Sequence, residues 1–256
     1  MNPKDDAQEI DLLPEAVARQ VADLARRAQR LNGPLMNGLM AIGGKAEAWA
    51  AALPVPVRGT MDGMARGLLE RLYTGAGQVR GHLPEAGDWG HRLAASFSGA
   101  AGGSVGLASA LVELPGTVML MFGAMQKEAA RAGFDPEAPE VRLSCLDIFG
   151  AGRPGPEDDG INTTFLGARL AVNAAAVQAV IGRVLPAFSA MLGKSLAGKA
   201  VPLIGAVAGA GINYAFTDYY QQVARVRFGL MRLAEDHGAG PIHHAFRAEM
   251  AERLTV

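Results

Sequence analysis

Two carboxylates stand at positions where an acidic side chain could do chemistry. Glu113 interrupts the longest uncharged region of the chain, and Asp147 stands between Leu146 and Ile148. Burial raises the pKa of a carboxyl group, and two such groups in one cleft can act as a catalytic acid and base. The alternative is structural, with Glu113 at a helix boundary beside Pro115 and Asp147 on a solvated helix face. We expect the structural alternative, and an enzyme that uses both acids is the competing hypothesis.

Three histidines near the carboxyl end, His237, His243 and His244, form the histidine cluster of the chain. A metal site needs ligands about one helical turn apart and a third partner such as a carboxylate or cysteine. His243 and His244 are adjacent, so a helix directs them to different faces. We therefore expect surface histidines and no metal, although the enzyme hypothesis could use this region.

Other reactive patterns are incomplete. The single Cys145 follows an apolar spacing, which predicts a buried thiol, and there is no second cysteine for a metal cluster. Ser104 lies in a Gly-x-Ser-x-Gly pattern but no β-strand precedes it, as a nucleophile elbow requires. Gly193-Lys194-Ser195 ends like a phosphate loop, yet Phe188 stands where the first glycine belongs. The sequence therefore predicts no catalytic residue and no cofactor.

The composition favours helices. Half of the 256 residues are hydrophobic, 19% are charged, only 6% are aromatic, and 33 are glycine. A β-sandwich needs more β-branched and aromatic residues than this chain provides. We predict an all-α fold, a multi-helix bundle whose apolar helices are rich in glycine and alanine and pack closely.

The net charge and the first residues indicate where the protein is located and which classes of partner it could bind. The formal net charge is −1 and no long Lys/Arg run is present, which argues against nucleic-acid binding. The first residues carry Asp5, Asp6, Glu9 and Asp11 before any apolar run, unlike a secretion signal. We expect the cytoplasmic side, where peripheral contact with the inner membrane remains an open alternative.

The amino-terminal region, residues 1–95, contains three predicted helices. The first has Asp11 as its expected cap, Pro14 near its first turn, and an apolar row on one face: Val17, Val21, Leu24, Ala28 and Leu31. The second covers residues 35–53 and ends before two prolines. The third runs from about Arg58 to His82.

Residues 96–256 contain the glycine-rich helices. The run Leu93–Val112 carries no charge for twenty residues, and its Ala, Gly and Ser content favours a buried helix over a membrane span. We expect a break at Glu113-Leu114-Pro115, then helices over residues 116–132 and 137–149. Residues 150–160 hold turn residues and acids, which predict an exposed loop.

A second uncharged run, Ala200–Thr217, follows the loop and an Ala-rich helix. Gly205 and Gly209 are four residues apart and Asn213 lies one turn further, so all three share one helix face. We expect this face, with Pro202 before it, to meet another helix or a partner at close range. An amphipathic stretch to Gly238 and a short helix from Pro241 complete the chain.

Two segments resemble the EcsC family. Leu114–Gly133 begins with Leu-Pro and ends in Ala-Arg-Ala-Gly, and Cys145-Leu-Asp-Ile-Phe149 is similar to a Cys-Leu-x-x-Phe segment of that family. Val201–Asn213 resembles its Val-Pro-x-x-Gly-Ala-x-x-Gly-Ala-x-x-Asn segment, with one extra glycine at Gly211. The resemblance implies a helical bacterial protein associated by name with an ABC exporter locus. It implies no reaction and no catalytic residues.

The sequence therefore favours a non-enzymatic interaction protein over an enzyme. Its partner would be a membrane surface or a membrane protein such as an ABC exporter, because the two uncharged helices suit close helix contacts. Lys194 and Lys199 beside the second run supply a weakly basic edge for an anionic membrane. An ordinary bundle that buries both helices within itself is the alternative. The oligomeric state is left open.

Overall fold

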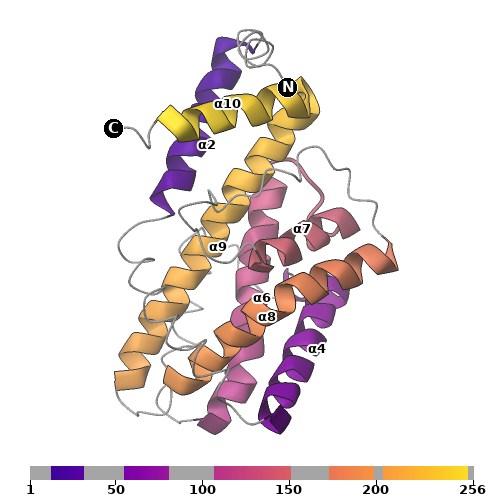
Figure 1. The fold of residues 1–256 in the computed structure, drawn as a ribbon, viewed down its shortest axis with the longest axis vertical. Coiled ribbons are helices and arrows are strands. Elements are labelled where there is room, and N and C mark those ends of the chain that lie inside the picture. The colour runs from indigo at the N-terminus through magenta and orange to yellow at the C-terminus, as the bar shows by residue number, and fades with distance from the viewer. Residues whose placement is uncertain (1–12, 32–54, 81–106, 151–172, 199–203, 253–256) are drawn as a thin grey trace.

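The computed structural model describes residues 13–31, 55–80, 107–150, 173–198 and 204–252, and Figure 1 shows the arrangement of their helices. Every element of this part is an α-helix, which confirms the predicted all-α fold. The helices are α2 (Glu15–Arg30), α4 (Val55–Arg80), α6 (Leu107–Arg131), α7 (Pro139–Gly150), α8 (Ala174–Gly198), α9 (Ile204–His237) and α10 (Ala239–Glu252).

Helix α9 is the longest described helix and connects the two ends of the bundle. Its 34 residues correspond to a length of about 51 Å, so it reaches beyond the other described helices. Its middle packs against α6, and its last turns pack against α2 and α10 (Figure 1). On the other side, α8 lies against both α4 and α7. One helix therefore joins two separate hydrophobic clusters.

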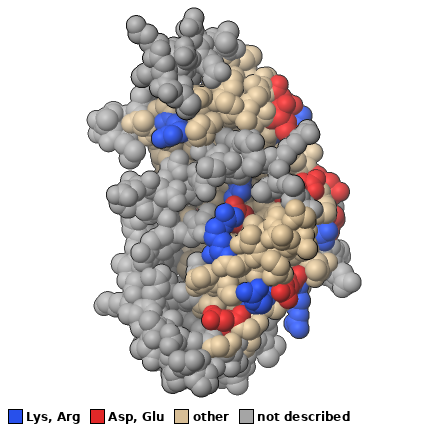
Figure 2. Space-filling model, turned by 45° about the vertical axis from the view of Figure 1, so that its right-hand side comes forward, with Lys and Arg blue, Asp and Glu red and all other residues tan. Residues whose placement is uncertain are grey.

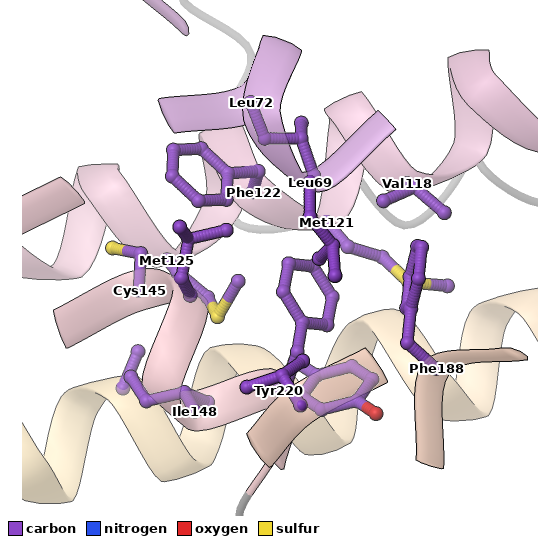
Figure 3. Close-up of a cluster of buried hydrophobic side chains, with 14 of the residues drawn as sticks. Leu69, Leu72, Val118, Met121, Phe122, Met125, Cys145, Ile148, Phe188 and Tyr220 are labelled. Carbon is purple, nitrogen blue, oxygen red and sulfur yellow. The ribbon is translucent and has the colours of Figure 1, made fainter. Parts of the chain in front are cut away.

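We call the larger cluster the main core. It joins α4, α6, α7, α8 and the middle of α9, and Figure 3 shows side chains of this cluster converging from these helices. Phe149 of α7 lies among other rings, with its centroid 4.9 Å from that of Tyr220 on α9 and 5.6 Å from that of Phe188 on α8. Aromatic pairs at these separations stabilise beyond their buried area. The ring contacts therefore link three helices at one point.

We call the smaller cluster the end core. Apolar side chains of α2, of the last turns of α9 and of α10 form it: Val17, Val21, Ala25, Ala28, Val226, Leu230, Leu233, Ile242, Ala245, Phe246 and Met250. The α2 members repeat the predicted apolar row, in which Leu24 is partly buried and Leu31 belongs to the main core. Helix α2 thus covers one end of α9.

Two glycines end helices where the sequence predicts it. Gly133 has a φ of 87°, and the N–H of Phe134 donates to the carbonyl of Ala129 at 3.0 Å, which caps α6. Gly238 has a φ of 88° and donates to Ala234 at 2.9 Å, which ends α9. Only glycine adopts this left-handed conformation without strain. The predicted helix end at His237-Gly238 is confirmed.

Three local expectations were wrong. Helix α6 runs without a break through Glu113-Leu114-Pro115, because its packing on α9 and α4 outweighs the backbone hydrogen bond that proline removes. Helix α2 begins after Pro14, which lies at its N-cap and provides no side-chain cap, so the expected capping by Asp11 has no place. Helix α10 begins at Ala239, two residues before Pro241.

Some expectations fall outside the residues that the structure describes. They concern the second predicted helix, most of the uncharged run Leu93–Val112, and the predicted loop from residue 151 onward. Among the helices that are described, none is long and apolar enough to cross a membrane.

Candidate functional site

A buried carboxylate at Glu128 joins α6 to α9. Its side chain is only 2% exposed, and it accepts hydrogen bonds from Gln221 Nε2 at 2.8 Å and from Arg225 Nε at 2.8 Å. Arg131, one turn away on α6, donates to Oε1 at 2.6 Å. Two guanidinium groups and an amide therefore neutralise and solvate this carboxylate. We call these four residues the Glu128 cluster.

The neighbouring Gln126 fixes the turn that follows α6. Its side chain is buried, and its Nε2 donates to the carbonyl oxygen of Pro136 at 2.7 Å. Asp135 in the same turn accepts the N–H of Glu137 at 2.9 Å. The turn between α6 and α7 is thus held by polar side chains on both sides.

A second polar cluster surrounds Asp147 of α7. Its carboxylate pairs with Arg227 of α9 at 2.7 Å and with Arg183 of α8. Arg227 is buried, with a side chain 4% exposed, whereas that of Arg183 is 60% exposed. We call these three residues the Asp147 cluster. It ties three helices together at the edge of the main core, where the side chain of Asp147 is 18% exposed.

Burial governs the electrostatics of this region. Desolvation lowers the pKa of Arg227, and the nearby charge of Asp147 opposes that effect. Burial also raises the pKa of the Cys145 thiol, although Arg227 acts in the opposite direction. A thiol held in its protonated form is a poor nucleophile. Cys145 is therefore a core residue, as its apolar spacing predicts.

The structure describes the side chains of some predicted site residues and not of others. Glu113 lies within α6, but its side chain is outside the described set, so its relation to Asp147 is not shown. His243 and His244 lie on α10 with ring centroids 5.6 Å apart. In the described part of the chain, no group of three histidines, cysteines or acids could hold a metal ion.

The glycine face predicted on the second uncharged run lies at the start of α9. Gly205, Gly209 and Asn213 all fall within this helix, which agrees with their expected helical spacing. What their face meets lies outside the described side chains, as does Pro202 altogether. Close packing at these four residues stays a prediction.

Helix α8 carries a feature that sequence reasoning missed. Val177, Val180, Ile181 and Val184 face the core, while an uncharged row is exposed on the opposite side: Ala175, Ala179, Gly182 and Pro186. We call this row the α8 stripe. Its spacing of 4, 3 and 4 residues was visible in the sequence, but which face points outward depends on the neighbouring helices.

Sequence reasoning also missed the Glu128 cluster, although one signal for it was present. Met121, Met125 and Glu128 are spaced by four and three residues, which places the acid on the buried face of α6. Arg227 likewise falls on an apolar row between Val223 and Leu230. A charge in an inward row predicts a buried partner on a neighbouring helix.

The helices and both clusters define a class, an all-α bundle in which buried ion pairs hold the central helices together. The EcsC protein family matches residues 78–233, more than half of the chain, and the chain belongs to this family. The match covers both segments on which the resemblance depends, apart from the last few residues before Gly238. No curated protein and no solved structure shows significant similarity to the chain.

Proposed function

We propose that this EcsC family member is a non-enzymatic interaction protein that works at the cytoplasmic face of a membrane and contacts a membrane protein through the α8 stripe. The supporting observation is that α8 exposes a row of small uncharged residues between Gln178 and Arg183, whereas the exposed face of a typical surface helix is charged and polar throughout. Figure 2 shows uncharged surface between acidic and basic side chains on the side of the molecule that carries α8.

Small side chains make the α8 stripe suitable for a helical partner. A Cβ added at Gly182 would find nothing within 4 Å, so the surface there is open. Small residues at helical spacing let two backbones approach closely, and such contacts are typical of helices in membrane proteins. The partner we propose is therefore an apolar helix that a membrane protein, such as an ABC exporter, presents at the membrane face.

Pro186 leaves a backbone carbonyl on the same surface without its usual hydrogen-bond donor. It lies inside α8 and has no N–H, so the carbonyl of Gly182 loses its usual donor one turn earlier. Both residues are exposed. A partner that carries a hydroxyl or an amide could donate to this carbonyl, which would give the contact direction as well as area.

The ion pairs of Asp147 weigh against the enzyme alternative. Asp147, one of the two acids that the enzyme hypothesis requires, is engaged by two arginines that belong to neighbouring helices. A catalytic acid or base must exchange a proton with substrate, which competes with such pairing. No observation favours the hydrolase alternative specifically.

Cell fractionation with a carbonate wash tests the proposal. We expect the wild-type chain in the membrane pellet and its release by carbonate, as for a peripheral protein. Ala179→Arg should move most of the protein to the soluble fraction, because it places a charge within the α8 stripe. Ala248→Arg is the matched control, since Ala248 is an exposed alanine on α10 and its replacement should change nothing.

Two outcomes contradict the proposal. A wild-type chain found entirely in the soluble fraction would exclude a stable membrane partner. Equal effects of the two substitutions would show that the α8 stripe has no special role. Flotation with anionic lipid vesicles free of protein, weakened by salt, would instead assign the contact to lipid and to basic groups such as Lys194.

A further inference from the structure

Helix α4 carries a row of glycines with open space beside it. Gly59, Gly63 and Gly67 are spaced by four residues, and a Cβ added at any of them would find nothing within 4 Å. Glycine is less favourable than alanine in the interior of a helix. The described part of the chain gives no packing reason for these glycines, whereas a close approach by another helix on this face would require them.

A row of alternating charges runs beside the glycines. Asp62, Arg66 and Glu70 follow at steps of four residues, so they share one flank of α4. Asp62 and Arg66 are exposed and Glu70 is partly exposed. Arg66 does not bond to either acid but donates to Gln178 of α8 at 3.1 Å. Within the described residues, Asp62 and Glu70 form no ion pair.

This charge pattern is complementary to itself. When two copies of a helix pack antiparallel, the same flank of each faces the other. With the twofold axis at position 64, Asp62 of one copy lies opposite Arg66 of the other, and this pair occurs twice. A parallel arrangement in register would place like charges together.

Met64 supports the same register. Its side chain is 42% exposed, whereas the other large hydrophobic side chains of the described residues are buried or partly buried. It lies on the flank of the glycine row opposite the charges. In the register that pairs Asp62 with Arg66, Met64 meets Met64 of the second copy near the axis. Open glycines, paired charges and the exposed methionine thus agree on one arrangement.

We infer that two copies of this chain associate through α4, antiparallel, with their glycine rows in contact at Gly63 and Gly67. The side of the molecule on which α4 lies carries interspersed acidic and basic groups (Figure 2). A contact built mainly from one helix of each copy is smaller than a standard protein interface, so the dimer is weak. The inference is independent of the α8 stripe.

Sedimentation of the full chain over a range of concentrations tests the inference. We expect the wild-type mass to rise from that of one chain to that of two as the concentration increases through the micromolar range. Gly63→Leu should leave the fold intact, because the position faces open space, but should raise the dimer dissociation constant at least roughly tenfold. Ala248→Leu, at an exposed alanine of α10, is the matched control and should dimerise like the wild type.

A charge exchange tests the register. Asp62→Arg alone places arginine opposite Arg66, and Arg66→Asp alone places aspartate opposite Asp62, so each variant should remain monomeric. An equimolar mixture should recover the mass of two chains, because every facing pair is again opposite in sign. A wild-type chain that stays monomeric at all concentrations overturns the inference. Dimerisation unaffected by Gly63→Leu, or single variants that dimerise normally, also overturns it.

Discussion

The main core and the end core are held together in different ways. In the main core, ion pairs connect different helices: Glu128 of α6 bonds to Arg225 of α9, and Asp147 of α7 bonds to arginines of α8 and α9. Beside the end core, Arg19 pairs with Glu15 and Arg232 pairs with Asp236, so each of these pairs stays within one helix. Apolar side chains of α2, α9 and α10 pack against one another there.

The two kinds of contact have different consequences. A buried ion pair between helices permits one register only, because a shift leaves a charge without its partner. Apolar contacts tolerate small shifts, and the free energy that they provide scales with the area they bury. We therefore expect the central helices to be rigidly aligned and α2 to be the more easily separated.

The family match covers both polar clusters but only part of each core. It ends at Leu233, the last end-core residue of α9, and leaves out α2, α10 and all but the last three residues of the main-core helix α4. It includes all members of the Glu128 and Asp147 clusters. The polar clusters therefore belong to the part of the chain that resembles the family, while α2 and α10 attach to the end of its longest helix.

The largest effect is expected at Glu128. Glu128→Ala leaves Arg225, Arg131 and Gln221 without their shared acceptor and should lower the free energy of unfolding by about 3–5 kcal/mol. Glu235→Ala removes an exposed acid that pairs with Arg232 and should change it by less than about 0.5 kcal/mol. Urea unfolding of the two variants measures the contrast. Similar small losses would show that the Glu128 cluster does not hold the core.

The Asp147 cluster should respond asymmetrically. Asp147→Ala leaves the buried Arg227 without its carboxylate, which should cost about 2–3 kcal/mol. Arg183→Ala removes an exposed partner and leaves the pair with Arg227 in place, so the loss should stay below about 1 kcal/mol. Thermal unfolding of both variants tests this order. A larger loss for Arg183→Ala would contradict the assignment of Arg227 as the buried partner.

We expect the end core to unfold separately from the main core. Val21 is fully buried, and Val21→Ala should remove about 1–2 kcal/mol of packing between α2 and α9. Hydrogen exchange should show lower protection for α2 amides, while α6 amides keep theirs. As a control, Leu69→Ala in the main core should lower protection in α4 and α6 together. If Val21→Ala lowers protection equally in α6, the two cores unfold as one unit.

Much of the fold could be predicted from the sequence because helical periodicity is local. The apolar row of α2, the inward residues Val141, Cys145 and Ile148 of α7, and the glycine that ends α9 all follow from spacing and backbone preference. The break expected at Pro115 did not occur, since contacts with distant helices decide whether a proline is tolerated.

The candidate surfaces were harder to predict because exposure depends on the other helices. The sequence shows that Ala175, Ala179 and Gly182 share a face, but not that the face is exposed. Glu128 and Arg225 are 97 residues apart, and no local pattern pairs them. The uncharged run pointed to Gly205, whereas the described helical glycines with open space around them lie on α4 and, at Gly182, on α8.

The smallest expected effect separates two glycines that look alike in sequence. Gly63 lies in the interior of α4 with open space around it, so Gly63→Ala should raise the stability of the monomer by about 0.5–1 kcal/mol. Gly229 lies in the interior of α9, where a Cβ would stand 3.0 Å from Cδ2 of Leu24 on α2. The same gain in helix propensity is available there, but Leu24 must move to accommodate the methyl group.

We therefore expect Gly229→Ala to change the free energy of unfolding less favourably than Gly63→Ala, with a value near zero or a net loss. Denaturant titrations at concentrations low enough to keep the chain monomeric compare the two directly. The double variant Leu24→Ala with Gly229→Ala removes the obstructing side chain, so the alanine at position 229 should then be as favourable as the one at position 63. If Gly229→Ala alone is equally stabilising, α2 adjusts freely on α9, and the end core is looser than its packing indicates.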